Sequence, residues 1–433
     1  MRDLEASTHD LQRHDGFDGA RDFAREIDAD EVEAMARSGL PDFPQHATSR
    51  GSSSALTIPP FPGTTAPGDA ATITPARRGR GAVSNPPNRF DKQAAVATDD
   101  GWATLEVDFT DLPPLPTTLT RDVSRSVISY NTSPDMGFDR AVNPYRGCEH
   151  GCVYCYARPS HAYLGYSPGL DFETKLLFKP DMAEILEKEL RRPGYIPRPI
   201  ALGSNTDPYQ PVERTLKLTR AVLGVLDRFN HPFTIVTKSD GVIRDIDLLK
   251  PLAERNLVRV CLSVTTLDGN LARRMEPRAA TPARRLLAIE ALARAGIPAG
   301  VLAAPMIPAL NDAELERILE AASRAGAGWA GYVLLRLPHE LKQMFEEWLN
   351  THFPDRARHV LELVRQTRGG ALNDSTFGQR FSGTGAYADM LASRFTRAVN
   401  QLKLENRDLL DCTQFRVPAS TRKGFADSQM SLF

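Results

Sequence analysis

Between residues 182 and 337, short apolar runs alternate with longer runs in which apolar residues recur every three or four positions. The short runs predict β-strands at Pro199–Gly203, Phe233–Thr237, Val258–Val264, Pro298–Ala304 and Tyr332–Leu337. The longer runs predict amphipathic helices at Met182–Arg191, Thr215–Phe229, Ile243–Arg255, Pro282–Ala295 and Ala313–Arg324. Strands that alternate with helices in this way favour a parallel sheet with helices outside it.

The pattern changes on both sides of this region. After His339 the chain has long helical stretches, at Leu341–Leu349, Pro354–Thr367 and Ala386–Leu404, which we interpret as an appended helical region over residues 338–423. Before it, residues 1–75 are rich in Asp, Ser, Pro and Gly, and the first fifty carry 12 acidic against six basic residues. Such a segment buries too little apolar surface to order itself, so we expect a disordered tail.

Composition narrows the class of protein only slightly. The 433 residues are 41% hydrophobic, which supports a real core, and the formal net charge of -1 excludes a globally basic nucleic-acid binder but not a local basic patch. Five cysteines, an odd number, fit a reducing compartment better than a disulfide scaffold. We find no long apolar run and no signal peptide, so we expect a cytoplasmic protein that is not bound to a membrane.

Three of the five cysteines lie within eight residues. Cys148, Cys152 and Cys155 are separated by Gly151 and preceded by Gly147, so the backbone can turn three thiolates toward one point. Three thiolates do not close a tetrahedral site, and in this stretch only His150 competes as a fourth ligand, so an open coordination position is implied. A zinc knuckle, a disulfide loop and chance clustering are the alternatives.

The spacing C-x3-C-x2-C, with Tyr154 before the last cysteine, resembles the signature of the radical SAM enzymes. The resemblance implies that Cys148, Cys152 and Cys155 hold a [4Fe-4S] cluster and that S-adenosylmethionine (SAM) binds its fourth iron, giving a 5′-deoxyadenosyl radical. The words Asn143-Pro-Tyr145 and Tyr154-Cys-Tyr-Ala-Arg158 are similar to the branch that contains spore photoproduct lyase and its DNA-photolyase-like relatives.

The same resemblance implies a fold for the alternating region. Radical SAM enzymes have a partial (β/α)6 TIM-type barrel, and the similarity covers residues 140–337. In such barrels the active site lies at the C-terminal ends of the strands, so polar residues just after an apolar run are the candidates for cofactor binding.

The first polar strand end is the loop from Leu202 to Glu213. Its word Thr206-Asp-Pro-Tyr-Gln-Pro-x-Glu213 is similar to one in the photolyase-like relatives, which favours Ser204, Asn205 and Asp207 as cofactor contacts. Glu213 and Thr206 have an alternative role as caps of the helix that follows.

Further candidates follow the next two strands. By resemblance, Lys238 meets the SAM carboxylate as a point charge, Ser263 hydrogen-bonds the ribose or methionine part, and Tyr154 packs beside the adenine. For Lys238 the alternative is a solvent-facing or Asp-paired lysine, and for Tyr154 a simple loop anchor.

Cys261 is a candidate hydrogen-atom donor. It lies two residues before Ser263, so in a regular strand both side chains point the same way, although most lone strand cysteines are small core residues. Spore photoproduct lyase has a donor cysteine beside the serine of the segment that resembles Leu202–Asn205, and here Gly203 occupies that place. This departure counts against thymine-dimer lysis by the known route.

Two segments suggest partners. In residues 76–139, the linker and lead-in to the barrel, Arg77-Arg-Gly-Arg80 suits either phosphate contact with a nucleic acid or a solvated linker. In the flexible tail of residues 424–433, Gln429, Leu432 and Phe433 resemble the peptide by which bacterial DNA polymerases and repair proteins dock on the sliding clamp; a chance match in a disordered end is the alternative.

The sequence therefore predicts a radical SAM enzyme that abstracts hydrogen atoms, with an electron donor as a further partner and DNA as the expected substrate in a repair reaction. The alternatives are radical SAM modification of RNA or protein, and a non-catalytic DNA-associated iron-sulfur module. Polar residues at the strand ends separate these cases, because a structural cluster has no use for Ser204, Asp207 and Lys238 around it.

Overall fold

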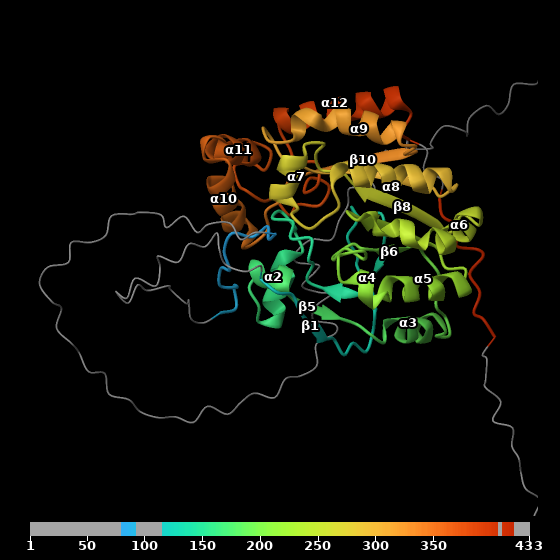
Figure 1. Ribbon diagram of the computed structural model, residues 1–433. Coiled ribbons are helices and arrows are strands. Elements are labelled where there is room, and N and C mark those ends of the chain that lie inside the picture. The colour runs from blue at the N-terminus through green and yellow to red at the C-terminus, as the bar shows by residue number, and fades with distance from the viewer. Residues whose placement is uncertain (1–78, 92–114, 406–408, 420–433) are drawn as a thin grey trace, which may run out of the picture.

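The computed structural model describes residues 79–91, 115–405 and 409–419. The tail predicted over residues 1–75 and the docking peptide predicted at Gln429–Phe433 lie outside the described residues. The described chain is an α/β fold built on a largely parallel sheet with helices on its outside (Figure 1), and this confirms the predicted fold class.

The main sheet has seven strands in the order β10-β9-β8-β7-β6-β3-β2. Their bounds are β2 (Ile128–Tyr130), β3 (Arg140–Val142), β6 (Ile200–Leu202), β7 (Phe233–Thr237), β8 (Val258–Ser263), β9 (Ala299–Met306) and β10 (Trp329–Leu334). All neighbouring pairs from β3 to β10 are parallel, and β2 is antiparallel to β3. Six parallel strands in this order form the partial barrel.

Helices follow the barrel strands as the periodicity predicts. They are α3 (Met182–Leu190), α5 (Leu218–Arg228), α6 (Ile246–Glu254), α8 (Pro282–Arg294) and α9 (Leu315–Arg324). Each buries its apolar stripe against the sheet in one continuous core. No helix among the described residues is both long and apolar enough to cross a membrane.

The covering layer extends past the predicted barrel boundary at residue 337. Helix α12 (Ala386–Leu402) packs against α9 and β10, and Leu391 and Phe395 belong to the barrel core. Figure 1 shows α12 lying beside α9 over β10. The last helix of the region that we expected to be appended is therefore part of the barrel.

Several predicted boundaries differ from the structure, and two of the differences have a clear physical cause. Strand β10 begins at Trp329, three residues earlier than predicted, because Trp329 pairs with Gly300, where an added Cβ would lie 2.1 Å from the indole ring. The helix predicted from Thr215 is broken at Lys217, whose φ of 53° separates α4 (Glu213–Leu216) from α5.

The remaining elements surround the C-terminal ends of the strands. They are β1 (Thr118–Arg121), β4 (Tyr145–Arg146), β5 (Lys175–Phe178), α2 (Leu170–Thr174), α7 (Gly269–Met275), α10 (Leu341–His352), α11 (Pro354–Gln366) and the 3-10 turns η2 (Arg158–Leu164), η3 (Asp240–Asp245) and η4 (Asp312–Glu314). Strands β1, β5 and β4 form a small second sheet. Helices α10 and α11 belong to one hydrophobic cluster with Met275 of α7 and with Cys152 and Tyr154.

Residues 376–383, which we call the closing segment, span the open side of the barrel between β10 and β2. The backbone amide of Leu334 in β10 donates to the carbonyl oxygen of Phe381 at 2.9 Å. At the other side, Arg380 forms a buried ion pair of 2.7 Å with Asp135, in the loop between β2 and β3. The closing segment thus connects β10 with the loop that follows β2, and these two strands are the outermost strands of the seven-stranded sheet.

Candidate functional site

The three clustered cysteines lie on one loop, residues 147–156, which follows β4 and which we call the cysteine loop. Its turns depend on Gly147 and Gly151, whose φ angles of 78° and 68° are in the left-handed region. A Cβ at Gly147 would lie 2.7 Å from Leu176 and 2.8 Å from the carbonyl oxygen of Phe172. Glycine is therefore required for the loop to fold tightly against β5 and α2.

Cys148, Cys152 and Cys155 line one cavity at the C-terminal ends of the strands. The cavity has a volume of about 870 Å³, counted with the part open to solvent. Burial raises the pKa of the Cys148 thiol, and it raises the pKa of Cys152 to about 12. Binding of a metal group to these thiols would therefore release protons.

Within the described residues, no three His, Cys, Asp or Glu side chains converge closely enough to hold a single metal ion. This arrangement is compatible with a [4Fe-4S] cluster, because each cysteine then binds a different iron.

Five of the predicted cofactor contacts line the same cavity. They are Tyr154, Asn205, Asp207, Lys238 and Ser263. Asn205 and Asp207 follow β6, Lys238 follows β7, and Ser263 ends β8, so parallel strand ends bring them together as the barrel predicts.

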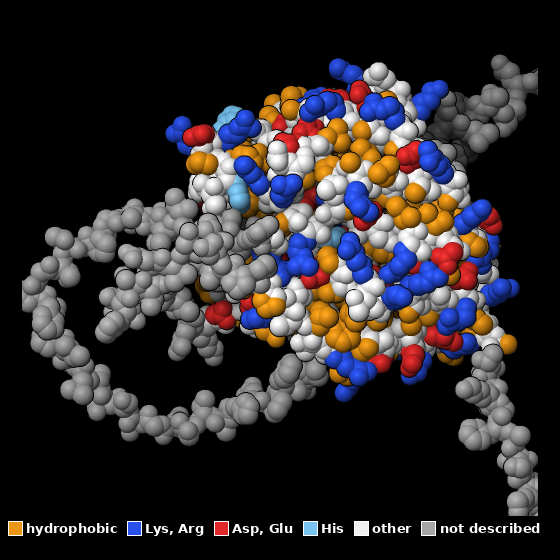
Figure 2. All heavy atoms as spheres, viewed as in Figure 1, with side chains coloured by type: hydrophobic (Ala, Val, Ile, Leu, Met, Phe, Trp, Pro, Cys, Tyr) orange, Lys and Arg blue, Asp and Glu red, His pale blue; other side chains and the backbone are white. Residues whose placement is uncertain are grey.

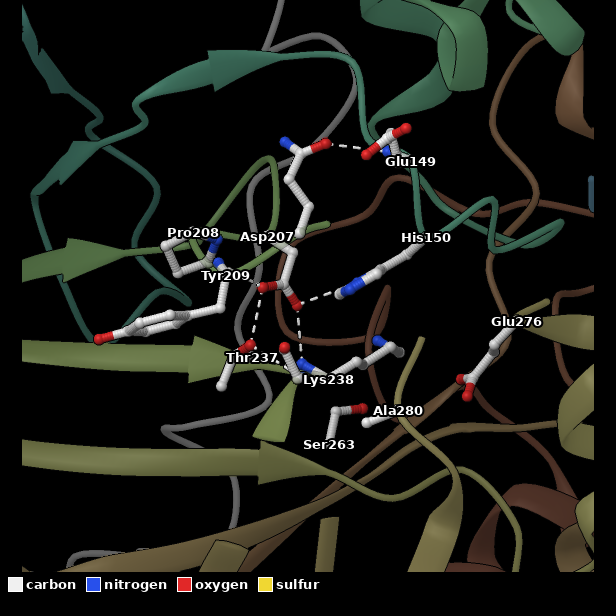
Figure 3. A network of polar contacts seen from close by, with 12 residues as sticks. Glu149, His150, Asp207, Pro208, Tyr209, Thr237, Lys238, Ser263, Glu276 and Ala280 are labelled. Atoms are coloured by element: carbon white, nitrogen blue, oxygen red, sulfur yellow. Dashed lines mark hydrogen bonds and ion pairs between the residues drawn. The ribbon is translucent and has the colours of Figure 1, made fainter. Parts of the chain in front are cut away.

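Asp207 is the centre of a network that joins three segments (Figure 3). Its carboxylate accepts hydrogen bonds from the backbone amide of Lys238 and the hydroxyl of Thr237, both at 2.7 Å, and from the amide of Tyr209 at 2.8 Å. His150 Nδ1 lies 3.3 Å from the same carboxylate. Burial opposes its ionisation, but His150 and these donors outweigh burial and lower the pKa of Asp207 to about 2. Asp207 therefore positions the cysteine loop and the end of β7.

The loop after β6 holds the cysteine loop at further points. Gln210 accepts from the amide of Glu149 at 2.9 Å and donates to the carbonyl oxygen of Gly147 at 3.2 Å. The side-chain oxygen of Asn143 accepts from the amide of Asn205 at 3.0 Å. These amides fix how the cysteine loop sits over the strands, and the sequence analysis missed their role.

Glu213 has the capping role that we considered for it, whereas Thr206 does not cap a helix and instead holds the segment of Tyr145. Both carboxylate oxygens of Glu213 accept from the amide of Thr219 at 3.2 Å, which caps the start of α5, and Glu213 also accepts from the hydroxyl of Tyr145. Thr206 donates to the carbonyl oxygen of Tyr145 at 2.9 Å. Neither residue lines the cavity.

Tyr154 is anchored by a buried ion pair. Its hydroxyl donates to Glu276, which also pairs with Arg285. Burial opposes ionisation of Glu276, but Arg285 and Lys238 outweigh burial, so the pKa of that carboxyl is lowered. The ammonium of Lys238 lies 5.7 Å from the centre of the Tyr154 ring, which brings a cation and an aromatic face to the same cavity wall.

Two predicted site residues do not line the cavity. Ser204 is 3% exposed and serves the loop, since its carbonyl oxygen accepts from the hydroxyl of Tyr156. Cys261 is fully buried and does not line the cavity, but it packs in one cluster with Leu302 and Val333, which do line it. It shares the direction of Ser263, as predicted, but lies two residues, about 7 Å, further down the strand. Its role as a hydrogen-atom donor stays a prediction, because the thiol packs behind residues of the cavity wall and does not itself line the cavity.

One wall of the cavity is formed by two residues that were not predicted from the sequence. Arg336 and Phe381 line it, and the guanidinium carbon of Arg336 lies 5.0 Å from the centre of the Phe381 ring. Arg336 was hidden because the predicted strand extended to Leu337, whereas β10 ends at Leu334.

Part of the predicted Arg/Gly segment, from Arg80 to Ala82, packs against Glu173 of α2. Arg80 is 6% exposed and donates to the carbonyl oxygen of Glu173 at 2.9 Å. The amides of Gly81 and Ala82 donate to the carboxylate of Glu173 at 3.0 and 2.8 Å. The expectation of a mobile guanidinium that contacts phosphate is therefore wrong for Arg80.

Comparisons with known proteins place this geometry in a family. A sequence model described as the radical SAM superfamily matches residues 142–322. An uncharacterized protein of Mycobacterium tuberculosis (strain H37Rv) is 37% identical over 233 residues, which are 53% of this chain and 68% of that protein. An uncharacterized protein of Methanocaldococcus jannaschii is 31% identical over 184 residues, or 42% of this chain and 66% of that protein.

Solved structures of spore photoproduct lyase are similar to this chain at a distance. One is 17% identical with a TM-score of 0.47, over 66% of this chain and 79% of that chain. Another, with bound AdoMet and dinucleoside spore photoproduct, is 16% identical with a TM-score of 0.47, over 68% and 85%. Likeness at this level carries no argument about the substrate of this chain. The sequence match and the barrel agree, and the chain belongs to the radical SAM superfamily, whose enzymes use a [4Fe-4S] cluster and S-adenosylmethionine.

Proposed function

We propose that Cys148, Cys152 and Cys155 hold the [4Fe-4S] cluster and that SAM binds beside it in the same cavity. The observation that carries this proposal is the meeting of three thiols, a lysine and an unsatisfied amide oxygen in one cavity. When bound, the cluster supplies one electron that cleaves the sulfonium of SAM to a 5′-deoxyadenosyl radical.

The residues of the chain supply binding and orientation. Asn205 Oδ1 is buried and has no hydrogen-bond partner among the described residues, so it would accept a donor such as the SAM amine. Lys238 would meet the SAM carboxylate, and the Tyr154 ring would pack against the adenine. The hydroxyl of Ser263, which donates to the carbonyl oxygen of Ala304 at 3.1 Å, keeps acceptor capacity toward the ribose.

The substrate in this proposal is a nucleic acid, with DNA repair as the expected setting. Support comes from the words shared with the spore photoproduct lyase branch and from the wall of Arg336 and Phe381. An aromatic ring beside a guanidinium suits a flat base, which stacks on the ring and offers acceptors to the arginine. Phe377, in the closing segment, is 53% exposed and contacts the guanidinium of Arg380, which also lies against the Phe381 ring.

The reaction would differ from that of spore photoproduct lyase in its hydrogen donor. A Cβ at Gly203 would lie 2.3 Å from the carbonyl oxygen of Val236, so this backbone leaves no room for a cysteine there. Cys261 is buried and does not line the cavity. The proposed reaction therefore includes the abstraction of a hydrogen atom. It does not include the return of a hydrogen atom from a thiol at residue 203 or 261.

We place this activity in the cytoplasm, because all five cysteines are free thiols and an oxygen-sensitive cluster needs a reducing compartment. The test is anaerobic reconstitution with iron and sulfide, followed by dithionite and SAM; release of 5′-deoxyadenosine is expected, and its absence counts against an enzyme. The control is the Cys148→Ala/Cys152→Ala/Cys155→Ala variant.

The substrate is identified by isotope transfer. DNA, RNA and protein from cells grown in deuterated water are supplied separately, and 5′-deoxyadenosine is examined by mass spectrometry. Deuterium from DNA supports the proposal. Deuterium from RNA or protein would instead assign the modification reaction, and 5′-deoxyadenosine without deuterium from any polymer would exclude all three substrates.

A further inference from the structure

A second hollow lies on the outer side of the cysteine loop. It is lined by four arginines, Arg214, Arg244, Arg278 and Arg284, with His150 at one wall and Asp240 beside Arg284. We call it the basic groove; its volume is about 1110 Å³, counted with the part open to solvent. Figure 2 shows Lys and Arg side chains gathered over this part of the surface, around α4.

The carboxylates that fix these arginines lie mostly behind the groove. Arg278 pairs with Glu149 at 3.1 Å and Arg244 pairs with Glu213 at 2.9 Å, while both carboxylate side chains are at most 5% exposed. The side chain of Arg278 is 35% exposed, and that of Arg244 is 29% exposed. The guanidinium groups thus face the groove and the carboxylates face the core.

Arg284 and Arg214 add charge at the rim. The Arg284 side chain is 68% exposed and pairs with Asp240 at 2.5 Å, and Arg214, on α4, is exposed. The groove therefore presents a surface that attracts a negatively charged partner, most strongly at low ionic strength.

The groove adjoins the loop that carries the candidate cluster ligands. His150 lies two residues from both Cys148 and Cys152, and it lines the groove as well as the cavity. The amide of Arg278, in the groove wall, donates to the carbonyl oxygen of His150 at 3.2 Å. A partner in the groove would be separated from the cavity by the cysteine loop.

We propose that the basic groove docks a small acidic electron-carrier protein that reduces the cluster. The proposal rests on the proposed function, because a SAM-cleaving cluster must receive an electron from outside the chain. One electron leaves the carrier and enters the cluster, and no bond or proton is transferred. The groove gives the carrier access to the cysteine loop without occupying the cavity, where SAM and the substrate would bind.

A nucleic acid fits this groove less well. Its reacting group would have to enter the cavity, where Arg336 follows β10 and Phe381 belongs to the closing segment. Neither residue lines the groove, whose walls come from the segments that follow β6, β7 and α7. Binding of a nucleic acid, and not of the electron carrier, to the groove would overturn the proposal.

The test uses the full chain with its reconstituted cluster, and an oxidised flavodoxin with an acidic surface as the probe. Charge reversal in the Arg214→Glu/Arg284→Glu variant is expected to weaken flavodoxin binding at least about tenfold at low salt, and the difference should shrink as salt is added. Titration calorimetry measures this affinity without any turnover. The matched control is Arg294→Glu, at the other end of α8, where the arginine side chain is 78% exposed.

Turnover separates this proposal from the proposed function. With reduced flavodoxin as donor, 5′-deoxyadenosine formation by the double variant should fall, while dithionite, which needs no docking, should drive wild type and variant equally. Wild-type flavodoxin affinity in the double variant would overturn the groove assignment. So would loss of affinity for a single-stranded oligodeoxynucleotide with flavodoxin binding retained. If dithionite yields no 5′-deoxyadenosine from wild type, the proposed function fails, whatever the binding result.

Discussion

The carboxylate of Asp207 accepts a hydrogen bond of 2.7 Å from the backbone amide of Lys238, and so ties the loop after β6 to the end of β7. The same carboxylate holds His150 of the cysteine loop. One side chain thereby sets the relative positions of the candidate SAM-binding lysine and the cysteines. An acid that lines an active-site cavity can thus act by positioning its neighbours.

Replacing Asp207 should therefore disturb the site before any chemistry occurs. Asp207→Ala leaves the donors of Lys238, Thr237 and Tyr209 without their acceptor in a buried position, and we expect a loss of about 3 kcal/mol in the free energy of unfolding. Urea denaturation of the cluster-free protein measures this loss. Asp247→Ala, which removes an exposed ion pair with Arg220, should cost at most about 1 kcal/mol. Equal costs would contradict the positioning role.

Gly203 should not tolerate a side chain. Its φ of 92° and the Cβ contact of 2.3 Å with the carbonyl oxygen of Val236 add a clash to backbone strain. Gly194 has a φ of 80° and no atom within 4 Å of an added Cβ, so Gly194→Ala carries the strain alone, about 1 kcal/mol.

We therefore expect Gly203→Ala to be destabilised by at least about 2 kcal/mol more than Gly194→Ala, and Gly203→Cys by a similar margin. Thermal and urea unfolding of the three variants provide the comparison. A stable Gly203→Cys protein would show that this position accepts the donor cysteine of the lyase branch after all.

Local spacing was enough to predict several of the residues that line the candidate cavity. Cys148, Cys152 and Cys155 are close in sequence, and Lys238 and Ser263 each stand at the end of an apolar run, so period and position identify them. Parallel strands then bring these ends together without further information.

Contacts between distant residues could not be predicted in the same way. Tyr154 is anchored by Glu276, 122 positions away, and neither residue carries a local sign of that contact. The start of β10 was missed because Trp329 packs on Gly300, a fit that depends on the neighbouring strand. The amino-acid propensities of a segment indicate only its local preference for helix or strand. The Tyr154–Glu276 contact and the start of β10 depend on tertiary packing instead.

The stability of the fold should fall between about pH 6.5 and pH 4 because of buried histidines. His231 is held between the hydroxyl of Tyr195 at 2.7 Å and the carbonyl oxygen of Pro232 at 2.9 Å, and burial lowers its pKa to about 4. The unfolded chain binds the proton at higher pH than the folded one, so acidification favours unfolding. The full shift corresponds to about 3 kcal/mol.

The check is urea denaturation at several pH values. His231→Gln should be less stable at neutral pH but should lose part of the pH dependence in this window. His161, whose pKa burial also lowers to about 4, should account for a further part. An unchanged slope in His231→Gln would mean that His231 does not titrate as its burial implies.

The C-terminal peptide remains a prediction, because Gln429, Leu432 and Phe433 lie outside the described residues. If the peptide docks on the sliding clamp, Leu432→Ala/Phe433→Ala should lose the two apolar anchors and abolish pull-down of the purified clamp. Ser431→Ala is the matched control and should bind normally. If Leu432→Ala/Phe433→Ala pulls down as much clamp as Ser431→Ala does, the clamp is not a partner of this peptide.

Lys238 provides the most direct test of where SAM binds. Lys238→Met keeps the length of the side chain against the Tyr154 ring but removes the charge, so we expect SAM to bind about tenfold more weakly, or about 1.4 kcal/mol, with the visible absorption of the cluster unchanged. Lys250→Met, on the exposed side of α6, should bind SAM normally. Cys155→Ala should lose both the absorption and SAM binding, because Cys155 would help to hold the cluster whose iron SAM would chelate. Equal SAM affinity in wild type and Lys238→Met would show that the carboxylate is held elsewhere.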